Sequence, residues 1–404
     1  MNFRKKGCRF AIIGSGNAGI ISALMILFSY KYNGHPVPEV VMYTDSKIPT
    51  EIVGQGTTVN VSTAIEYLLA NEAKNNTAGL TPKAGFYYRN WSKNPDMYYK
   101  LANSGLAYHF DPNKLRQTFL DKNYIRVVEK NVTPEEIKDR FDLVIDCRGK
   151  TVNDWEEYDE VASPVNCALL GRTYGFRPKE VWTEHIATPD GWAFKIPLED
   201  GHSYGYIFNE NITDPETAKK NFKDLLDVDT LHKIPFKNYR AKNYYDAKNK
   251  TLKNGNRLFF YEPLESNATP FYGTLITDIL FKSIDNGGKY ESDANRFKRG
   301  LKNFDIKIKQ MHEWILWHYY YGSHYDTPFW RYAKDMARNY EYSEDFIKLV
   351  ETARVADWDN YVGQYVFHDG IISEYTLHDY ISWMFENGGL EVEHPTLKVK
   401  EPVA

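Results

Sequence analysis

The chain has 404 residues, a formal net charge of −4 at pH 7 and an isoelectric point near 6.3. It is long enough for one large domain or two ordinary domains with a sizeable core. The balanced charge gives no general attraction to nucleic acid or to anionic lipid. We therefore expect no nucleic acid and no membrane as partners, and favour small solutes as ligands.

The cysteines and the N-terminal residues indicate the compartment. Cys8, Cys147 and Cys167 form neither a disulfide framework nor a paired metal-ligand spacing, which predicts a reducing, cytoplasmic location and no metal site. The first residues have the charge order of a secretory signal, but three glycines interrupt the apolar run 10–28 and no small-residue cleavage site follows it. No other segment has the length and purity of a transmembrane helix.

The first elements along the chain form a predicted βαβ unit. A strand over Arg9–Gly14 leads through a glycine turn into a helix from about Asn17 to Tyr30, and a second strand follows over Glu39–Asp45. The two strands of such a unit are parallel. The turn, "GSGNAG", has the G-x-G-x-x-G spacing, which lets backbone amides and the helix N-terminus bind a diphosphate. A dinucleotide site is favoured over a merely tight turn.

This motif supplies most of the candidate cofactor-binding residues. They are Gly14, Ser15, Gly16, Asn17, Ala18 and Gly19. Asp45, near the end of the second strand, is the candidate for the ribose hydroxyls, and a turn-forming role before "SKIP" is the alternative. FAD and NAD share the motif, so it does not distinguish between them.

The pattern of polar and apolar residues changes twice in the rest of the chain. "FDLVIDCRG" (141–149) is a further buried strand closed by Gly149. Between about 166 and 209, polar and apolar residues alternate around Gly and Pro, as in antiparallel strands, and after Asp293 the patterns are helical. We expect a core over 1–290, with a nucleotide part at about 1–150 and 251–290 and an antiparallel sheet at about 151–250. A helical cap over 291–404 closes it.

The segment "YEPLESN" (261–267) places polar groups directly after an apolar run. Pro263 is incompatible with a helix interior and with a central strand. Two carboxylates and a hydroxyl lie beside this proline, so we expect the end of a strand to deliver them to a site.

Seven stretches, in order over about the first 340 residues, resemble flavin-dependent halogenases of the tryptophan-halogenase type. They are "DSKIPTEIVGQGTTV" (45–59), "GLTPKAGFYYRNW" (79–91), "GLAYHFDPNKLRQTFL" (105–120), "FDLVIDCRG" (141–149), "GWAFKIPL" (191–198), "EPLES" (262–266) and "WHYYYGSHYDTPFWR" (317–331). One match could arise by chance, but seven in family order are hard to explain otherwise. The resemblance implies an α/β, flavin-monooxygenase-like (glutathione-reductase-type) FAD-binding fold with an inserted antiparallel sheet and a helical C-terminal cap.

The resemblance also implies catalytic roles. Lys83 falls at the family's catalytic lysine and Glu265 at its catalytic glutamate, with Ser266 beside it to orient the lysine. In this family reduced flavin and oxygen convert halide into hypohalous acid, which the lysine hydrogen-bonds or takes up as a haloamine. Burial lowers the pKa of a lysine and suits either role, while the glutamate polarises the oxidant or accepts the proton of the arene. Without the resemblance, Lys83 would be expected in solvent and Glu265 at a helix cap.

Further residues are assigned by the same resemblance. Gly54 lies in the segment that straps over the flavin, and Gly149 closes the second flavin fingerprint. The implied substrate and halide channel comprises Trp192, Phe194, Ile196, Pro197, Asn267 and Ala268. Trp192 and Phe194 would form a wall between substrate and flavin, with simple core packing as the alternative. We interpret the three histidines of the helix and turn 312–324 as packing or capping residues.

The chain departs from the family pattern at several points. Phe194 replaces the second tryptophan of the Trp-x-Trp-x-Ile-Pro signature, and Arg148 replaces a small residue. The interval after Lys83 and the cap after Arg331 are shorter than in tryptophan halogenases, and a glycine loop before "EPLES" is missing. These differences imply an open site for another electron-rich arene and a preference for the easily oxidised bromide and iodide. The abundance of Asn, Lys and Tyr suits an A/T-rich, phage-like genome.

The sequence therefore predicts a halogenase that uses FADH2, O2 and halide to modify a small aromatic substrate. No second dinucleotide motif is visible for NAD(P)H, so a separate flavin reductase would supply FADH2, and a homo-oligomer is compatible with the sequence. A flavin hydroxylase and a non-catalytic flavin-binding protein are the alternatives.

Overall fold

The computed structural model describes most of the chain up to residue 348. The described residues are 7–49, 53–69, 75–91, 96–100, 107–150, 154–266, 268–280, 283–284, 288–290 and 295–348, with the backbone alone for 96–100 and 321. Of the predictions above, Asn267 and the part of the helical cap beyond residue 348 lie outside these ranges.

A six-stranded sheet carries the predicted βαβ unit. Its order is β17 (Tyr245–Asp246), β18 (Thr251–Lys253), β9 (Leu143–Asp146), β1 (Arg9–Ile13), β2 (Glu39–Thr44) and β8 (Arg126–Glu129), and every neighbouring pair except β17 with β18 is parallel. Phe10 and Ile12 of β1 pack into one core and Ala11 and Ile13 into another. Because both faces of this sheet are covered, its central strands are continuous apolar runs, as the sequence indicated.

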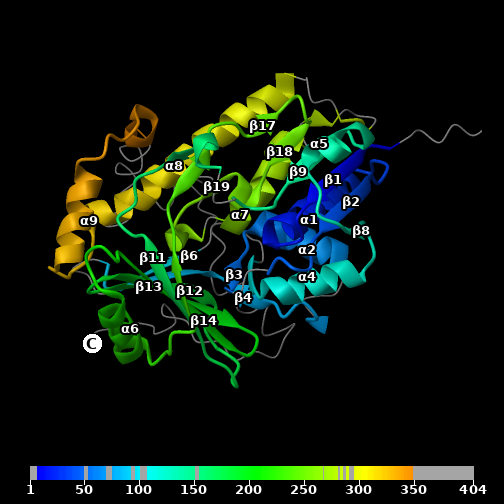
Figure 1. Ribbon diagram of the computed structural model, residues 1–404. Helices are drawn as coiled ribbons and strands as arrows, with labels where there is room; N and C mark the ends of the chain where they lie inside the picture. Colours follow the sequence, from blue (N-terminus) through cyan, green and yellow to red (C-terminus); the bar gives the residue numbers. More distant parts are fainter. Residues whose placement is uncertain are drawn as a thin grey trace, which may run out of the picture.

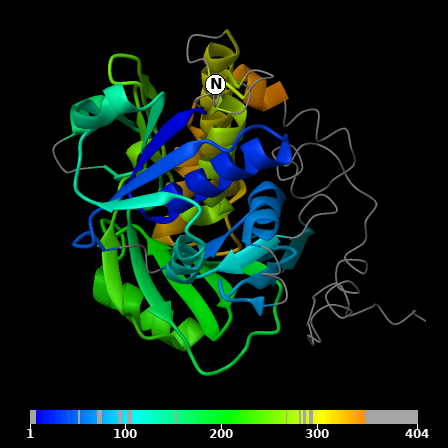
Figure 2. The same ribbon diagram turned by 90° about the vertical axis from the view of Figure 1, so that its right-hand side faces the viewer.

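Helices α1 (Asn17–Tyr32), α2 (Val59–Leu69) and α4 (Pro112–Asp121) lie on one face of this sheet. Figure 2 shows α1 and α2 side by side. Short elements complete this region: α5 (Pro134–Ile137), a 3-10 turn (Lys138–Arg140), α7 (Ala268–Leu275) and a π-helical turn (Ile276–Leu280). The parallel strands β1 and β2 and the helix between them confirm the predicted βαβ unit.

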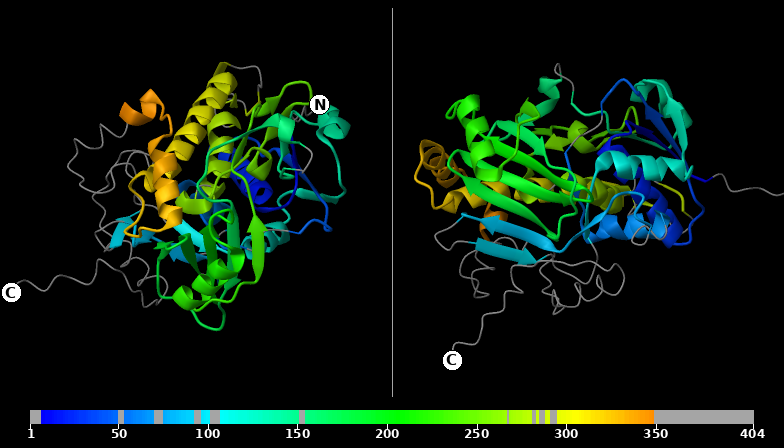
Figure 3. Two further views of the ribbon diagram at one scale, coloured as in Figure 1. Left: turned by 60° about the vertical axis from the view of Figure 1, so that its left-hand side comes forward. Right: turned by 90° about the horizontal axis from the view of Figure 1, so that it is seen from below.

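The second large layer is a seven-stranded sheet. Its order is β15 (His232–Pro235), β11 (Cys167–Arg172), β14 (Gly201–Phe208), β13 (Gly191–Leu198), β12 (Trp182–Thr188), β5 (Gly85–Arg89) and β6 (Asp96–Lys100). All pairs are antiparallel except β12 with β5. Figures 1 and 3 show this sheet beside the six-stranded one.

Alternation along these strands separates two faces. Tyr206 and Phe208 of β14 pack against Phe222 of α6 (Pro215–Leu226), which covers the outer face. Trp192 and Phe194 of β13 point to the opposite face and join the main core. Successive side chains of a strand point to opposite faces of the sheet. This register therefore directs Trp192 and Phe194 of "GWAFKIPL" toward the main core.

Two small sheets connect the layers. One pairs β3 (Gln55–Gly56), β7 (Ala107–Phe110) and β4 (Thr81–Lys83), and the other pairs β10 (Tyr158–Glu160), β16 (Tyr239–Ala241) and β19 (Phe259–Phe260). Three 3-10 turns cover Trp155–Glu157, Gly255–Arg257 and Pro263–Glu265. The second small sheet ends at β19, directly before "EPLES".

A long helix, α8 (Asn295–Tyr321), crosses the molecule and is followed by α9 (Pro328–Arg338). Phe304, Ile308, Met311 and Ile315 follow the helical period and are buried. The predicted division into a core and a cap stays a proposal, and the two large sheets each draw strands from more than one predicted part. Within the described part of the chain, no helix is long and apolar enough to cross a membrane.

Candidate active site

The glycine turn has the geometry that a diphosphate requires. Gly14 has φ +103°, and a Cβ there would lie 2.8 Å from the carbonyl oxygen of Cys147. A Cβ on Gly19 would lie 2.1 Å from the carbonyl oxygen of Gly14, so this glycine lets α1 pack against the turn. By contrast, a Cβ on Gly16 or on Gly149 would meet nothing within 4 Å. The two open glycines leave room for a ligand at the N-terminus of α1.

Polar groups flank this turn. The Ser15 hydroxyl lies 2.6 Å from the hydroxyl of Thr44, and the Arg116 guanidinium donates to the backbone oxygen of Ser15 at 3.0 Å. Arg116, to which no sequence motif points, brings a positive charge close to the glycine turn, where it could pair with an anion. Asp45 comes directly after β2, and its carboxylate accepts from the Lys47 amide and from Asn131. Its ribose role stays a prediction.

The N-terminus of α1 is tied to the segment after "EPLES". The Asn17 side-chain amide donates to the Thr269 hydroxyl at 2.9 Å, and both residues are buried. Ala18 packs in the same core, and a Cβ on Gly255 would lie 2.4 Å from its methyl group. The "EPLES" region therefore packs directly on the glycine turn and the start of α1.

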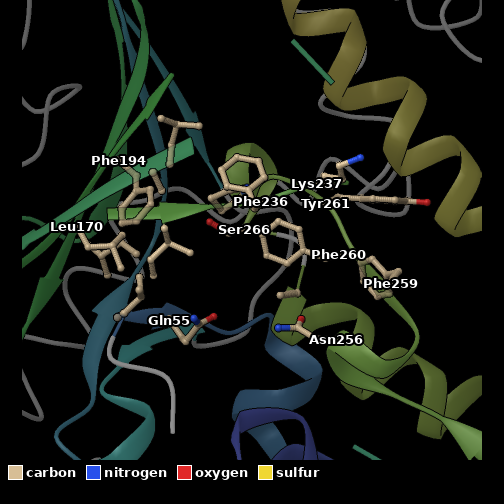
Figure 4. Close-up of a pocket in the computed structure, with 18 of the residues that line it drawn as sticks. Gln55, Leu170, Phe194, Phe236, Lys237, Asn256, Phe259, Phe260, Tyr261 and Ser266 are labelled. Carbon is tan, nitrogen blue, oxygen red and sulfur yellow. The ribbon is translucent and has the colours of Figure 1, made fainter. Parts of the chain in front are cut away.

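A cavity of about 870 Å³ lies between the seven-stranded sheet on one side and residues 53–56 with Phe259 and Phe260 of the second small sheet on the other. Predicted site residues on its wall are Gly54, Phe194, Ile196, Ser266 and Ala268. Figure 4 shows Phe194 and Leu170 on one side, Asn256, Phe259 and Phe260 on the other, and Gln55 between them. The predominantly apolar and aromatic wall suits a flat, conjugated ring system.

The two predicted wall aromatics have different positions. Phe194 borders the cavity, and a Cβ on Gly205 of the neighbouring strand would lie 2.3 Å from its ring, so Gly205 makes space for it. Trp192 lies deeper, beside Phe194 with ring centroids 6.2 Å apart, and does not line the cavity. Pro197 does not line it either, and its carbonyl accepts from the Thr81 hydroxyl.

Lys83 is buried at the end of β4, behind Gly56 of β3. A Cβ on Gly56, which lines the cavity, would lie 2.8 Å from Nζ of Lys83, and this nitrogen lies 4.2 Å from the centre of the Phe86 ring. Burial lowers the pKa of Lys83 to about 7, opposed by the charge of Glu265. The amine is therefore close to half neutral at neutral pH.

Glu265 lies in an aromatic pocket beneath the seven-stranded sheet. Its Oε1 accepts from the Tyr88 hydroxyl at 2.7 Å and lies 2.8 Å from Nε2 of His318. The side chain of His318 is almost fully buried and stacks on the ring of Tyr88. The next residue, Ser266, has φ +48°. This left-handed residue lets the chain turn from Glu265 into α7.

The other carboxylate of "EPLES" anchors the tryptophan of the wall. Glu262 is fully buried, and its Oε2 accepts from Nε1 of Trp192 at 3.1 Å and from the Tyr319 hydroxyl at 2.7 Å. Burial raises the pKa of Glu262 to about 7, although its hydrogen-bond donors oppose the shift. Glu262 thus joins β13, the "EPLES" turn and α8.

The structure brings the predicted residues of four distant segments together. Lys83 and Glu265 are close enough to influence each other's charge, and Ser266, Phe194 and Gly54 share one cavity. Tyr88, His185, Glu262 and His318 were missed as site residues. The sequence predicts a packing or capping role for His318; its ring does bond the Trp314 carbonyl, but it also contacts Glu265. Only the fold places these four together.

Comparison with known proteins agrees with this geometry. A family profile described as "Tryptophan halogenase" matches residues 9–133 and 122–371. The tryptophan 7-halogenase of Lentzea aerocolonigenes is 29% identical over 162 residues, which are 39% of this chain and 29% of that protein. The tryptophan 6-halogenase of Streptomyces albogriseolus is 24% identical over 268 residues, 57% of this chain and 48% of the relative. The matches thus span less than half of these relatives.

The fold is shared over a greater length. The crystal structure of a tryptophan 6-halogenase from Streptomyces toxytricini superposes with a TM-score of 0.72 at 18% identity, covering 98% of this chain and 94% of that one. This similarity confirms the predicted FAD-binding α/β fold.

Proposed function

Because this chain belongs to the tryptophan halogenase family, we propose that it is a halogenase that uses FADH2 and O2 to oxidise halide and to halogenate an electron-rich aromatic compound. The main support is the buried position of Lys83, with a pKa of about 7, next to the cavity and within the electrostatic influence of Glu265. Burying a lysine destabilises the fold, and groups with such strongly shifted pKa values are concentrated at functional sites.

The site fits FAD. The open space at Gly16 and Gly149 and the cation of Arg116 suit its diphosphate, and the apolar cavity suits its three-ring isoalloxazine. Bound in reduced form, FAD would supply the electrons with which oxygen oxidises halide to hypohalous acid. The chain's own residues would exclude water, separate the arene from the flavin and receive the acid.

Lys83 is the residue that receives the oxidised halogen. In its neutral form, the amine can donate a hydrogen bond to the oxygen of hypohalous acid. It can also attack the halogen, forming an N–halogen bond and releasing water as the O–halogen bond breaks. Its pKa of about 7 keeps a substantial fraction of the amine neutral at neutral pH, whereas a solvated lysine would be almost entirely charged.

Glu265 is the residue that receives the proton of the arene. Attack of the aromatic ring on the halogen forms a carbon–halogen bond as the N–halogen or O–halogen bond breaks and leaves its electron pair on nitrogen or oxygen. The ring is then a cation, and a carboxylate nearby stabilises it and accepts the proton that restores aromaticity; that proton finally replaces the halogen on the leaving amine or hydroxide. Tyr88 holds this carboxylate in place at 2.7 Å. Ser266, on the cavity wall, orients the side chain of Lys83.

The substrate, halide and reductant are finer parts of the proposal. The substrate is a phenol or an indole. Phe194 at the cavity wall, in place of a second tryptophan, supports use of bromide and iodide over chloride. FADH2 comes from a separate flavin reductase. An assay with equimolar chloride, bromide and iodide measures the halide preference. Chloride as the best substrate would contradict it.

The test is a mass-spectrometric assay with FAD, a flavin reductase, NADH, oxygen and each halide, offered to a panel of phenols and indoles. Wild type, Lys83→Met and Lys195→Met are compared, with catalase present. Lys195 is a matched control because it is a partly buried lysine of β13 that pairs with Glu180. We expect wild type to form a product with the mass shift of a halogen. The amount of this product should fall at least about 100-fold in Lys83→Met but not in Lys195→Met.

Two other outcomes identify the alternatives. Hydroxylated product that needs no halide and survives loss of Lys83 indicates a hydroxylase. Bound flavin that consumes oxygen only to give peroxide indicates a flavin-binding protein without turnover. Thermal unfolding of all variants confirms that the loss of product is not a loss of fold.

A further inference from the structure

His185 is a buried polar residue that the roles above do not use. It is fully buried on β12 and lines the cavity. Among the described residues, neither ring nitrogen has a hydrogen-bond partner. Buried polar groups in proteins are nearly always satisfied, and leaving one unpaired costs about 1–3 kcal/mol. A buried imidazole kept at this cost indicates a small polar ligand.

The sheet register places His185 between the cavity wall and the catalytic carboxylate. On one neighbouring strand it pairs with Phe194, which borders the cavity, and on the other with Tyr88, which donates to Glu265. Paired residues of neighbouring strands point to the same face of a sheet. His185 therefore lies on the line from the cavity toward the acid–base residues.

Packing fixes the ring in this place. The imidazole stacks on Phe86 with centroids 5.6 Å apart, and the rings of Tyr88 and Trp192 lie at 4.9 Å and 5.6 Å. Phe86 is also the ring beneath Nζ of Lys83. The imidazole and the lysine amine thus contact the same aromatic side chain.

The protonation state follows from the surroundings. Burial lowers the pKa of His185 to about 3; the charge of Glu265 opposes this shift, while Lys83 and His318 reinforce it. At working pH the ring is neutral, with one N–H donor and one acceptor nitrogen. A ligand that suits it has one hydroxyl donor and at least one acceptor.

We infer that His185 binds the hypohalous acid by hydrogen bonds while the acid passes from the flavin cavity to Lys83. The O–H group of the acid donates to one ring nitrogen. The N–H group of the other ring nitrogen donates to another oxygen atom along the path. No bond is broken at this residue, so His185 acts as a binding residue of the channel. The inference rests on the proposed halogenase function.

The test compares wild type, His185→Phe, His185→Gln and His202→Phe. Phe keeps the aromatic packing and removes both nitrogens, whereas Gln keeps a donor and an acceptor. His202 is a matched control because it is a buried histidine of β14 that contacts Glu180 and does not line the cavity. Halogenated product, NADH consumed and free hypohalous acid caught by an added scavenger are measured together.

We expect FAD affinity and NADH consumption to stay within about twofold in all variants. In His185→Phe, product per NADH falls about tenfold and scavenged acid rises, and Gln recovers part of the product. Equal product per NADH in wild type and in His185→Phe overturns the role of His185 while leaving the halogenase function intact. Absence of halogenated product from wild type overturns both.

A measurement without flavin gives an independent readout. In flavin-free protein labelled with ¹⁵N at histidine, hydrogen peroxide serves as a probe because its hydroxyl groups donate and accept as hypohalous acid does. We expect the ring nitrogens of His185 to shift on brief exposure to peroxide and those of His202 to remain unchanged. Unchanged His185 signals contradict the inference.

Discussion

At the scale of single residues, the buried ammonium group of Lys83 has a measurable consequence for stability. Its pKa is about 7 in the fold and about 10.4 in an unfolded chain. Since the folded state binds this proton less tightly, the stability that the group contributes is complete above the unfolded pKa. It is lost as the pH falls toward 7. Function and stability are therefore opposed at this position.

We predict that Lys83→Met is more stable than wild type at pH 7, and that the difference narrows on raising the pH. Between pH 7 and 10 the gap in unfolding free energy should shrink by roughly 1.4 kcal/mol per pH unit. Denaturant unfolding at several pH values measures it. A gap independent of pH would mean that Lys83 has an ordinary pKa in the folded protein.

Phe194 depends on the missing side chain of Gly205. Because a Cβ at that glycine would lie 2.3 Å from the ring, Gly205→Ala should displace Phe194 from the cavity wall. We predict a loss of about 1–3 kcal/mol in unfolding free energy and weaker FAD binding. In a Phe194→Leu background the same substitution should cost much less. Urea unfolding of the four proteins measures this coupling, and additive costs would contradict it.

At the scale of elements, α9 supports the pocket around Glu265 through a chain of aromatic contacts. Nε1 of Trp330 donates to the Thr188 carbonyl at 2.7 Å, and its ring packs on Trp91 at 5.4 Å. Trp91 in turn contacts the rings of Tyr88 and His318, both next to Glu265. The start of α9 is thus connected by contacts to Glu265, the proposed catalytic carboxylate.

The N-cap of α9 tests this relation. Thr327 accepts from the Trp330 amide and donates to the Pro189 carbonyl. We predict that Thr327→Ala lowers the unfolding free energy by about 1 kcal/mol and lowers halogenation several-fold. Asp214→Ala, which removes the N-cap of α6 on the outer face, should cost similar stability without affecting turnover. Equal effects of both variants on turnover would refute the relation.

At the scale of the whole molecule, the proposed FAD site is formed by parts of the chain that meet only in the fold. The glycine turn lies at the ends of β1 and β9, and the cavity lies between the seven-stranded sheet and the second small sheet. Binding to the folded state alone stabilises it, by about 2.7 kcal/mol at a ligand concentration of 100 times Kd. FAD should therefore raise the melting temperature of the protein.

Gly16→Val separates the fold from this binding. A Cβ at Gly16 meets nothing within 4 Å and its φ is −71°, so the FAD-free melting temperature should stay close to that of wild type. The increase on adding FAD should disappear, because the side chain fills the space for the diphosphate. Gly19→Ala is the contrasting variant, since its Cβ would clash with the Gly14 carbonyl and lower the FAD-free melting temperature. Unimpaired FAD binding by Gly16→Val would place the diphosphate elsewhere.

The local parts of this protein could be predicted from its amino-acid sequence. The strand, turn and helix around "GSGNAG", the alternating strands of 166–209 and the long helix after residue 293 all follow from periodicity and glycine spacing over a few turns. The family resemblance named Lys83 and Glu265 because motifs are short and contiguous. These features depend on neighbours along the chain.

The contacts between distant side chains became visible in the folded protein alone. His318 lies on α8 and contacts Glu265, Glu262 anchors Trp192, and His185 faces the cavity because of its register with Phe194. The shifted pKa values of Lys83 and Glu262 follow from burial by segments far apart in the sequence. Such properties depend on the removal of water and on charges brought close by folding, and no local pattern encodes them.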